Sequence, residues 1–271
     1  MKPHVTGHRD GFPPGFTAVS RHADPSHGTG LGFGVLKLAA GQRVVTALTN
    51  ETAWLLMHGA VRIRTGSIDA KFARASLFDE SASCLHASAG TEVAIEALEA
   101  AELTVYECAN NEPFASRAFH PVDVPNEHRG RGQVRNRSLR FVRTIFDRRN
   151  SPPQAELVLG EVVTLPGGWS SYPPHHHAQP EIYHYRFSAA QGYGHAEIGE
   201  SVVKARSGAT IFIPAGHDHA QCAAPGYGMY YSWVIRHLPG NPYTVPEFTA
   251  EHAWTMSTSA EFWWPRGMSD D

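Results

Sequence analysis

The chain has 271 residues, of which 42% are hydrophobic and 18% charged, so it has ample material for a core and no sign of global disorder. Its formal net charge of −3 gives no electrostatic argument for nucleic acid or an anionic membrane as a partner. The start of the chain has no apolar signal-peptide core, no apolar run approaches the ~20 residues that span a bilayer, and three separated cysteines suggest reduced thiols. We therefore expect a cytoplasmic protein.

Short apolar segments separated by turn residues run through most of the chain, which is typical of an all-β protein. Residues 1–30 are rich in Gly, Pro and His and are expected to form an irregular N-terminal arm. Strand-like segments follow at near-regular spacing, at residues 33–38, 53–57, 60–64, 75–78, 92–98 and 103–108. This spacing predicts a sandwich or barrel.

A polar stretch with three prolines, residues 109–128, interrupts the series and is expected to be a linker. Strand-like segments then resume, at residues 140–146, 157–165, 182–187, 209–214 and 228–235. Two similar series predict two tandem β-barrel domains, over residues 31–118 and 119–271. The identity between the two halves is too weak to establish a repeat from sequence.

The clearest candidate for chemistry is SSYPPHHHAQPEIYHY, residues 170–185. Its two prolines disfavour a helix, and side chains of an extended segment alternate between two faces. His175 and His177 then share one face, while His176 points to the other. After a three-residue turn Glu181 adds a carboxylate, and two nitrogens with one oxygen suit Zn²⁺, Mn²⁺ or Fe²⁺. A solvated histidine-rich surface patch is the competing interpretation.

A further ligand is expected from GATIFIPAGHDH, residues 208–219, where an alternating strand and a turn precede His217 and His219. These two segments together resemble the paired motifs of the cupin superfamily. The first motif is matched by Gly168, His175, His177 and Glu181. The second is matched by Gly208, Pro214, Gly216 and His219, with Ala223 where the motif has asparagine. The resemblance implies a metal centre of His175, His177, Glu181 and His219, with His217 as the alternative to His219.

The flanking sequence resembles the 5-deoxy-glucuronate isomerase family of myo-inositol catabolism, which is related to the 4-deoxy-5-hexulose-uronate ketol-isomerases. The likeness lies in GWSSYPPHHH (168–177), GEVVTLP (160–166) and APGYGMYY (224–231). It implies an all-β bicupin of two tandem jelly-roll domains, the first without metal ligands. It also implies a divalent metal, zinc foremost, with manganese, iron or nickel as alternatives. Because bicupins commonly associate and sheet edges need covering, we expect a homo-oligomer.

The resemblance implies an aldose–ketose isomerase that acts on a deoxy-uronate sugar acid. Such a reaction moves a proton between neighbouring carbons, and a bound cation can stabilise the negative charge that develops. Tyr183, Tyr185 and Glu161 are candidates for the base, and the sequence does not choose among them. A cupin dioxygenase with a redox-active metal and a non-catalytic sugar-binding bicupin are the alternatives.

Eight arginines lie between Arg129 and Arg149. Nucleic-acid binding is disfavoured because the chain is net acidic and no base-stacking module accompanies them. Arginine matches a carboxylate with its planar fork, so Arg140 and Arg143 are candidates for binding the substrate's carboxylate.

Overall fold

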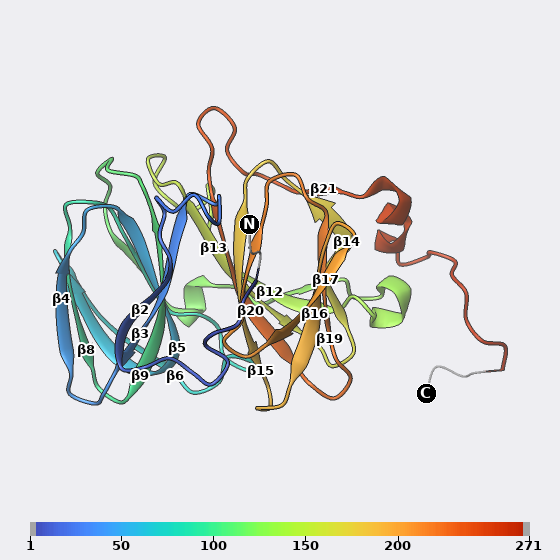
Figure 1. The fold of residues 1–271 in the computed structure, drawn as a ribbon, viewed down its shortest axis with the longest axis horizontal. Helices are drawn as coiled ribbons and strands as arrows, with labels where there is room; N and C mark the ends of the chain where they lie inside the picture. The colour runs from blue at the N-terminus through green and yellow to red at the C-terminus, as the bar shows by residue number, and fades with distance from the viewer. Residues whose placement is uncertain (1–3, 268–271) are drawn as a thin grey trace.

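The computed structural model describes residues 4–267, and two groups of strands lie side by side in it (Figure 1). The N-terminal half contains β2 (Gly15–Ser20), β3 (Leu31–Leu38), β4 (Arg43–Ala47), β5 (Glu51–Thr65), β6 (Ile68–Arg74), β7 (Cys84–Ala87), β8 (Glu92–Ala97), β9 (Ala101–Cys108) and β10 (Arg117–Phe119). The C-terminal half contains β11 (Glu127–Arg129), β12 (Arg140–Phe146), β13 (Leu157–Thr164), β14 (Trp169–His176), β15 (Glu181–Phe187), β16 (Tyr193–Ile198), β17 (Ser201–Arg206), β18 (Thr210–Ile213), β19 (His219–Ala223), β20 (Met229–Arg236) and β21 (Glu247–Phe248). Three short 3₁₀-helices are η1 (Pro121–Asp123), η2 (Gln133–Asn136) and η3 (Ala250–Met256). The predicted arm and second domain extend to residues 1–3 and 268–271, which lie outside the described range.

The predicted all-β class is confirmed. In the N-terminal half the strands run in the order β10-β7-β5-β9-β3-β2, and the long β5 also pairs with β6 and β8, while β8 pairs with β4. Alternation in the sequence sets the faces of these strands: on β6, Ala70 and Phe72 are buried while Asp69 and Lys71 are exposed. The inward side chains form an apolar cluster of this half alone.

The C-terminal half is built from two sheets that face each other. A seven-stranded sheet has the order β1-β18-β15-β20-β13-β12-β11, in which β1 is His4–Val5, and a five-stranded sheet has the order β17-β16-β19-β14-β21. Side chains from both sheets, among them Tyr183, Tyr231, Ala196 and Ala223, form the cluster between them. The seven-stranded sheet therefore turns one face toward this interior and its other face toward the N-terminal half.

The N-terminal arm is more ordered than the sequence suggests. β2 lies within the predicted irregular region and pairs with β3, and β1 (His4–Val5) pairs with β18 in the other half of the chain. Phe12 between them is buried in the core that both halves share. β1 completes a sheet whose other members lie far away in the sequence, so no local pattern marks it. Over the described residues 4–267, no helix has the length and apolar character needed to cross a membrane.

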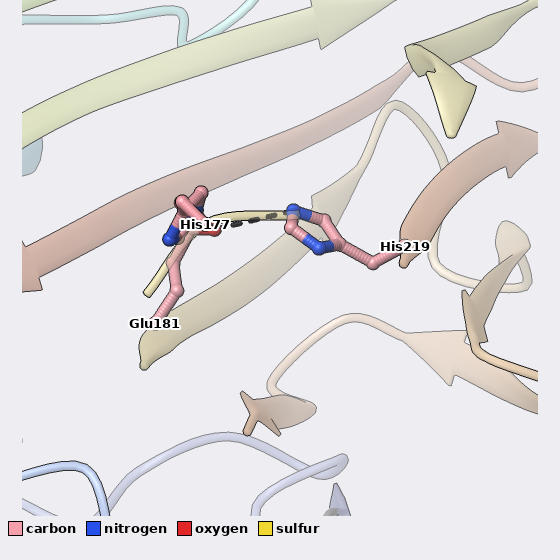
Figure 2. A group of neighbouring side chains, drawn as sticks. All are labelled: His177, Glu181 and His219. Atoms are coloured by element: carbon pink, nitrogen blue, oxygen red, sulfur yellow. Dashed lines mark hydrogen bonds and ion pairs between the residues drawn. The ribbon is translucent and has the colours of Figure 1, made fainter. Parts of the chain in front are cut away.

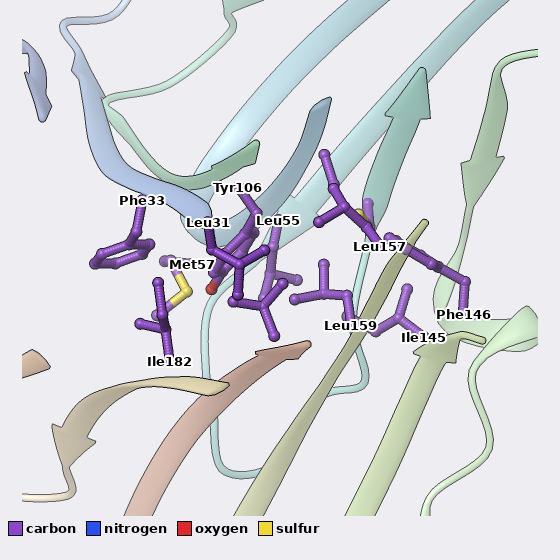
Figure 3. Packing of buried hydrophobic residues seen from close by; sticks show 14 of the residues in the cluster. Leu31, Phe33, Leu55, Met57, Tyr106, Ile145, Phe146, Leu157, Leu159 and Ile182 are labelled. Atoms are coloured by element: carbon purple, nitrogen blue, oxygen red, sulfur yellow. The ribbon is translucent and has the colours of Figure 1, made fainter. Parts of the chain in front are cut away.

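The two halves share one apolar core (Figure 3). Leu31, Leu55 and Met57 of the N-terminal half pack against Leu159 and Ile182 of the C-terminal half. All five side chains are at most 2% exposed. Burying apolar area on this scale is the main favourable term that holds the halves together.

A buried ion-pair network joins the halves within this core. The carboxylate of Glu161 on β13 is fully buried and accepts hydrogen bonds from Arg74 Nη1 at 2.9 Å, Arg143 Nη1 at 2.8 Å and the Tyr230 hydroxyl at 2.8 Å. Arg74 comes from the end of β6 in the N-terminal half. Because a buried charge is costly unless it is paired, the network fixes how the two halves sit against each other.

A second buried carboxylate, in the N-terminal half, also joins the two halves by hydrogen bonds. Glu51, at the start of β5, accepts hydrogen bonds from the backbone amides of Glu156 at 2.8 Å and Leu157 at 2.9 Å. Within its own half it contacts His86 at 2.7 Å and Asn110 at 2.7 Å. Each half thus supplies one carboxylate that is neutralised or hydrogen-bonded by the other.

Replacing Glu161 by glutamine is expected to lower the free energy of unfolding by about 3–5 kcal/mol, because two buried guanidinium groups lose their counter-charge. The matched control is Glu92→Gln, at an exposed site on β8, which is expected to change it by less than about 0.5 kcal/mol. Chemical denaturation of both variants measures the difference, and equal effects would contradict the assigned role.

The same network predicts a dependence of stability on pH. Burial alone would raise the pKa of Glu161, but Arg74 and Arg143 outweigh it and hold the pKa below the ordinary value of 4.5. A group with a depressed folded-state pKa contributes its stability above the unfolded value and loses it as the pH falls through the folded value. The free energy of unfolding of the wild type should therefore fall more steeply below pH 4.5 than that of Glu161→Gln. Parallel pH profiles would show that this carboxylate does not carry the effect.

Candidate metal centre

Three side chains meet between the two sheets of the C-terminal half (Figure 2): His177, Glu181 and His219. His177 directly follows β14, Glu181 begins β15 on the seven-stranded sheet, and His219 begins β19 on the five-stranded sheet. The turn before β19 is held by Gly216, which has a left-handed φ of 71° and donates its amide to the His177 carbonyl at 2.9 Å. Chain segments more than forty residues apart are thereby locked into one cluster.

The three residues have the spacing of a shared ion. Glu181 Oε2 lies 3.3 Å from His177 Nε2 and 3.4 Å from His219 Nε2. One candidate ligand atom from each residue lies within 4.8 Å of the other two, and all three side chains are buried. Atoms that ligate one zinc ion at bond lengths of about 2 Å lie roughly 3–4 Å apart, so the cluster could close on a cation with little movement.

The hydrogen bonds of the imidazoles also fit a cation. His177 Nδ1 lies 2.6 Å from the Gln179 carbonyl, and His219 Nδ1 lies 3.0 Å from the His217 carbonyl. A carbonyl only accepts hydrogen bonds, so each Nδ1 carries the proton and each Nε2 is directed at Glu181. His219 Nε2 is buried and has no hydrogen-bond partner. An unpartnered buried nitrogen beside a carboxylate fits a pair of metal ligands.

His175 stands next to this cluster, not within it. Its ring centroid lies 4.4 Å from that of His219 and 6.4 Å from that of His177, but it is not among the three residues whose ligand atoms lie within 4.8 Å of one another. Its Nδ1 faces a backbone carbonyl, as in the other two imidazoles, and here the carbonyl is that of Ser171 at 3.2 Å. His175 pairs with His219 across β14 and β19, so both side chains point inward.

The remaining histidines of the two motifs point elsewhere. His176 lies on the opposite face of β14 and contacts Asp218 at 2.7 Å, as the alternation predicts. His217 is exposed, and its Nδ1 faces the Ala215 carbonyl at 3.1 Å. The structure thus places His219, and not His217, beside Glu181.

Electrostatics hold the cluster in the protonation states that bind metal. Burial would raise the pKa of Glu181, but the neighbouring imidazoles of His177 and His219 lower it to about 2. Burial, followed by the proximity of His219, lowers the pKa of His175 to about 3. At neutral pH Glu181 is therefore a carboxylate and the adjacent His175 a neutral imidazole, which are the ligand forms of these groups.

A chain of hydroxyl groups leads away from the cluster into the interior. The Tyr183 hydroxyl lies 3.3 Å from Ser171 Oγ, which lies 3.1 Å from the Tyr231 hydroxyl, and Tyr231 donates to Ser170 Oγ at 3.0 Å. The ring centroid of Tyr183 is 5.9 Å from that of His219. Burial raises the pKa of Tyr231 to about 12, so its hydroxyl keeps its proton at neutral pH.

The three candidate bases have different surroundings. Tyr183 and Tyr185 share the inward face of β15 with Glu181, and Tyr185 donates its hydroxyl to Gln221 Oε1 at 2.6 Å. Glu161 does not face this interior. It pairs with Ser232, which pairs with His184, and these residues lie on the opposite face of the sheet. Its ion pairs within the core between the halves exclude the predicted role at the cluster.

The two candidate arginines separate in the same way. Arg143 pairs with Glu161 in the strand register, lies on the face toward the N-terminal half and is taken up by the buried network. It is therefore not available to a substrate at the cluster. Arg140 pairs with Thr164 and lies on the inward face, where burial lowers its pKa and Tyr231 is close enough to oppose that shift.

Two neighbours of the cluster were not predicted from the sequence. Tyr243 packs edge-on against His177, with ring centroids 5.1 Å apart, and Gln179 donates to the Asn241 carbonyl at 2.7 Å. Residues 237–246 follow the last long strand without periodicity or motif, so no sequence signal marked them.

Comparison with known proteins places the chain in a family. The profile of the KduI/IolB family matches residues 8–255, which is most of the chain. The chain belongs to the KduI/IolB family. The resemblance seen in the sequence is thereby confirmed.

Curated relatives of this KduI/IolB chain carry the name 5-deoxy-glucuronate isomerase. The protein from Geobacillus kaustophilus (strain HTA426) is 29% identical over 182 residues, which cover 60% of this chain and 62% of the relative. The protein from Lacticaseibacillus casei is 28% identical over 201 residues, covering 68% of this chain and 70% of the relative. The match to the Geobacillus protein thus spans less than two thirds of its length.

Solved structures show the same fold. An IolB-like protein from Salmonella typhimurium LT2 superimposes with a TM-score of 0.78 at 23% identity, covering 91% of this KduI/IolB chain and 97% of that protein. A cupin 2 conserved barrel domain protein from Leptotrichia buccalis superimposes with a TM-score of 0.52 at 12% identity, covering 87% and 96%. These likenesses establish a cupin-like fold.

The exchange His219→Ala in this KduI/IolB chain is expected to weaken Zn²⁺ binding by about 100-fold or more, since even residues behind metal ligands are worth 10–100-fold. His217→Ala changes an exposed histidine two residues away and serves as the matched control, with affinity expected to stay within about twofold. Competition with a chelating dye measures both. Equal Zn²⁺ affinity of the two variants would show that His219 is not a ligand.

Proposed function

We propose that this protein is a metal-dependent aldose–ketose isomerase that acts on a deoxy-uronate, most specifically 5-deoxy-glucuronate. The observation that carries the proposal is the buried cluster of His177, Glu181 and His219 in a chain of the KduI/IolB family. The names of the curated relatives supply the reaction and the substrate.

A divalent ion, Zn²⁺ by the donor set, would be held by His177, Glu181 and His219, with His175 proposed as the fourth ligand. The Nδ1 of His175 faces backbone carbonyls, which leaves its Nε2 free on the inward face beside His219. Two or three imidazoles and one carboxylate suit Zn²⁺, with Mn²⁺, Fe²⁺ and Ni²⁺ as alternatives. When bound, such an ion acts as a Lewis acid that stabilises negative charge on substrate oxygens.

The protein's own groups must then move the proton between neighbouring carbons of the sugar acid. Tyr183 is proposed to donate the proton that returns to the sugar acid, because burial raises the pKa of its hydroxyl, which therefore keeps its proton at neutral pH. This hydroxyl begins the chain through Ser171 to Tyr231 and lies on the face of β15 that carries Glu181. Neighbouring hydroxyl groups can pass hydrogen bonds along as charge changes at the first one. Arg140, on the same face of the sheet, adds a fixed positive charge near Tyr231.

Removal of metal with a chelator is expected to abolish isomerisation of 5-deoxy-glucuronate, and a divalent metal should restore it. The physical reason is that the developing charge on the substrate loses its counter-charge. Activity and metal content are measured on the same sample. Undiminished turnover by protein with no remaining metal would end the proposed mechanism.

The exchange Tyr183→Phe is expected to lower kcat by roughly 10²–10⁴-fold, the usual contribution of a positioned proton-transfer group. The fold should be kept, because the ring remains packed against Tyr231 and only the hydroxyl is lost. Tyr193→Phe on β16 is the matched control, since Tyr193 lies on another strand of the facing sheet. Steady-state kinetics give the comparison, and equal kcat values for the two variants would contradict the assignment to Tyr183.

A further inference from the structure

The N-terminal half arranges its strands in the same order as the C-terminal half. Its path β7-β5-β9-β3-β2 matches the path β18-β15-β20-β13-β12, and its paired strands β4 and β8 match β14 and β19. The register matches as well, because each half has a row of three paired residues that begins with a glycine: Gly34, Val105 and Trp54 in one half, Gly160, Trp233 and Tyr183 in the other. The strand positions around the metal centre therefore have counterparts in the N-terminal half.

The counterparts of the four candidate metal ligands carry no charge and no imidazole. Thr52 precedes Trp54 by two residues, as Glu181 precedes Tyr183. Counting further back along the chain, and following the pairing of β4 with β8, gives the counterparts of His175, His177 and His219, which are Thr46, Leu48 and Val93. Threonine and aliphatic side chains are not the ligands that a divalent cation takes, so this place does not repeat the metal centre.

A cavity of about 350 Å³ lies at this place in the N-terminal half. Three of the counterparts, Thr46, Leu48 and Thr52, line it. The greater part of the remaining lining is apolar and consists of Leu36, Val44, Trp54, Ile95 and Val105. Its rim is open to solvent, because Phe16, which also lines it, is 59% exposed. A volume of this size with an apolar wall is typical of small-molecule sites.

Two polar features of the wall decide what the cavity can bind. Trp54 is only 4% exposed, and its indole N–H makes no hydrogen bond within residues 4–267. A nearly enclosed donor without a protein partner favours a ligand that brings an acceptor. The one charged side chain of the lining is Glu107, which contacts His22 at 3.1 Å and accepts a hydrogen bond from Asn50 at 3.3 Å. Because the wall carries a carboxylate and no cationic side chain, it disfavours an anion and fits an uncharged molecule.

We propose that this cavity is a second binding site, which takes a small uncharged molecule with an apolar body and one hydrogen-bond acceptor that faces Trp54. The apolar wall supplies most of the binding free energy, and the indole N–H orients the ligand. In Figure 1, β4 and β8 lie at the left and β14 and β19 at the right, so the site is separate from the metal centre. The inference does not depend on the reaction proposed above.

The test is fluorine NMR of two uncharged probes, para-fluoroacetophenone and para-fluoro-ethylbenzene, titrated with the full chain. The probes are similar in size, and only the ketone carries an acceptor. Both should bind the wild type. Val44→Phe fills the cavity from β4 and should weaken both by about tenfold or more, since the apolar wall is no longer open to them. Val45→Phe is the matched control and should change neither, because the next residue of the strand points to the other face and is 51% exposed.

Trp54→Phe keeps an aromatic ring and removes the donor, so it should weaken the ketone by about fivefold and leave the hydrocarbon within about twofold. Each probe serves as the reference for the other in this variant, and thermal unfolding without probe checks the fold of all three variants. Any binding of para-fluorobenzoate should be the same in wild type and Val44→Phe, because the cavity disfavours an anion. The proposal is overturned if the wild type binds neither uncharged probe, if Val44→Phe and Val45→Phe have equal effects, if Trp54→Phe weakens both probes alike, or if Val44→Phe weakens para-fluorobenzoate.

Discussion

The architecture depends on one constraint, the alternation of side chains along the seven-stranded sheet. Because successive residues of β13, β15 and β20 point to opposite faces, one face packs on the N-terminal half and the other faces the candidate site. On β15, Glu181 and Tyr183 point inward, while Ile182 enters the core shared by the two halves. A shift of one residue in this register would exchange the two environments and bury Glu181 between the halves.

The two faces use charge differently. Toward the N-terminal half, Glu161 forms ion pairs with Arg74 and Arg143, so its charge stabilises the packing of the two halves. Toward the interior of the C-terminal half, Glu181 contacts the imidazoles of His177 and His219, and no guanidinium within residues 4–267 pairs with it, so it keeps the capacity to hold a cation. A carboxylate that is paired by arginine is structural, and one that faces imidazoles without an arginine is available for chemistry.

Sequence reasoning located the cluster because its signals are local. The inward positions of His175 and His177 follow from a period of two, and His219 follows from the motif after the turn. It failed for Glu161 because all eight residues of β13 are buried, so polarity does not show which face a residue takes. It failed for Tyr243 because loops carry no periodicity, and for β1 because its partner strand lies some two hundred residues away.

We propose that one ion is held between the two sheets of the C-terminal half. The most direct measurement is anomalous X-ray diffraction from crystals of the metal-loaded protein, collected at the absorption edge of the metal found in the sample. The account predicts one strong peak within bonding distance of the side chains of His177, Glu181 and His219. A fully loaded protein whose only peak lies elsewhere would contradict it.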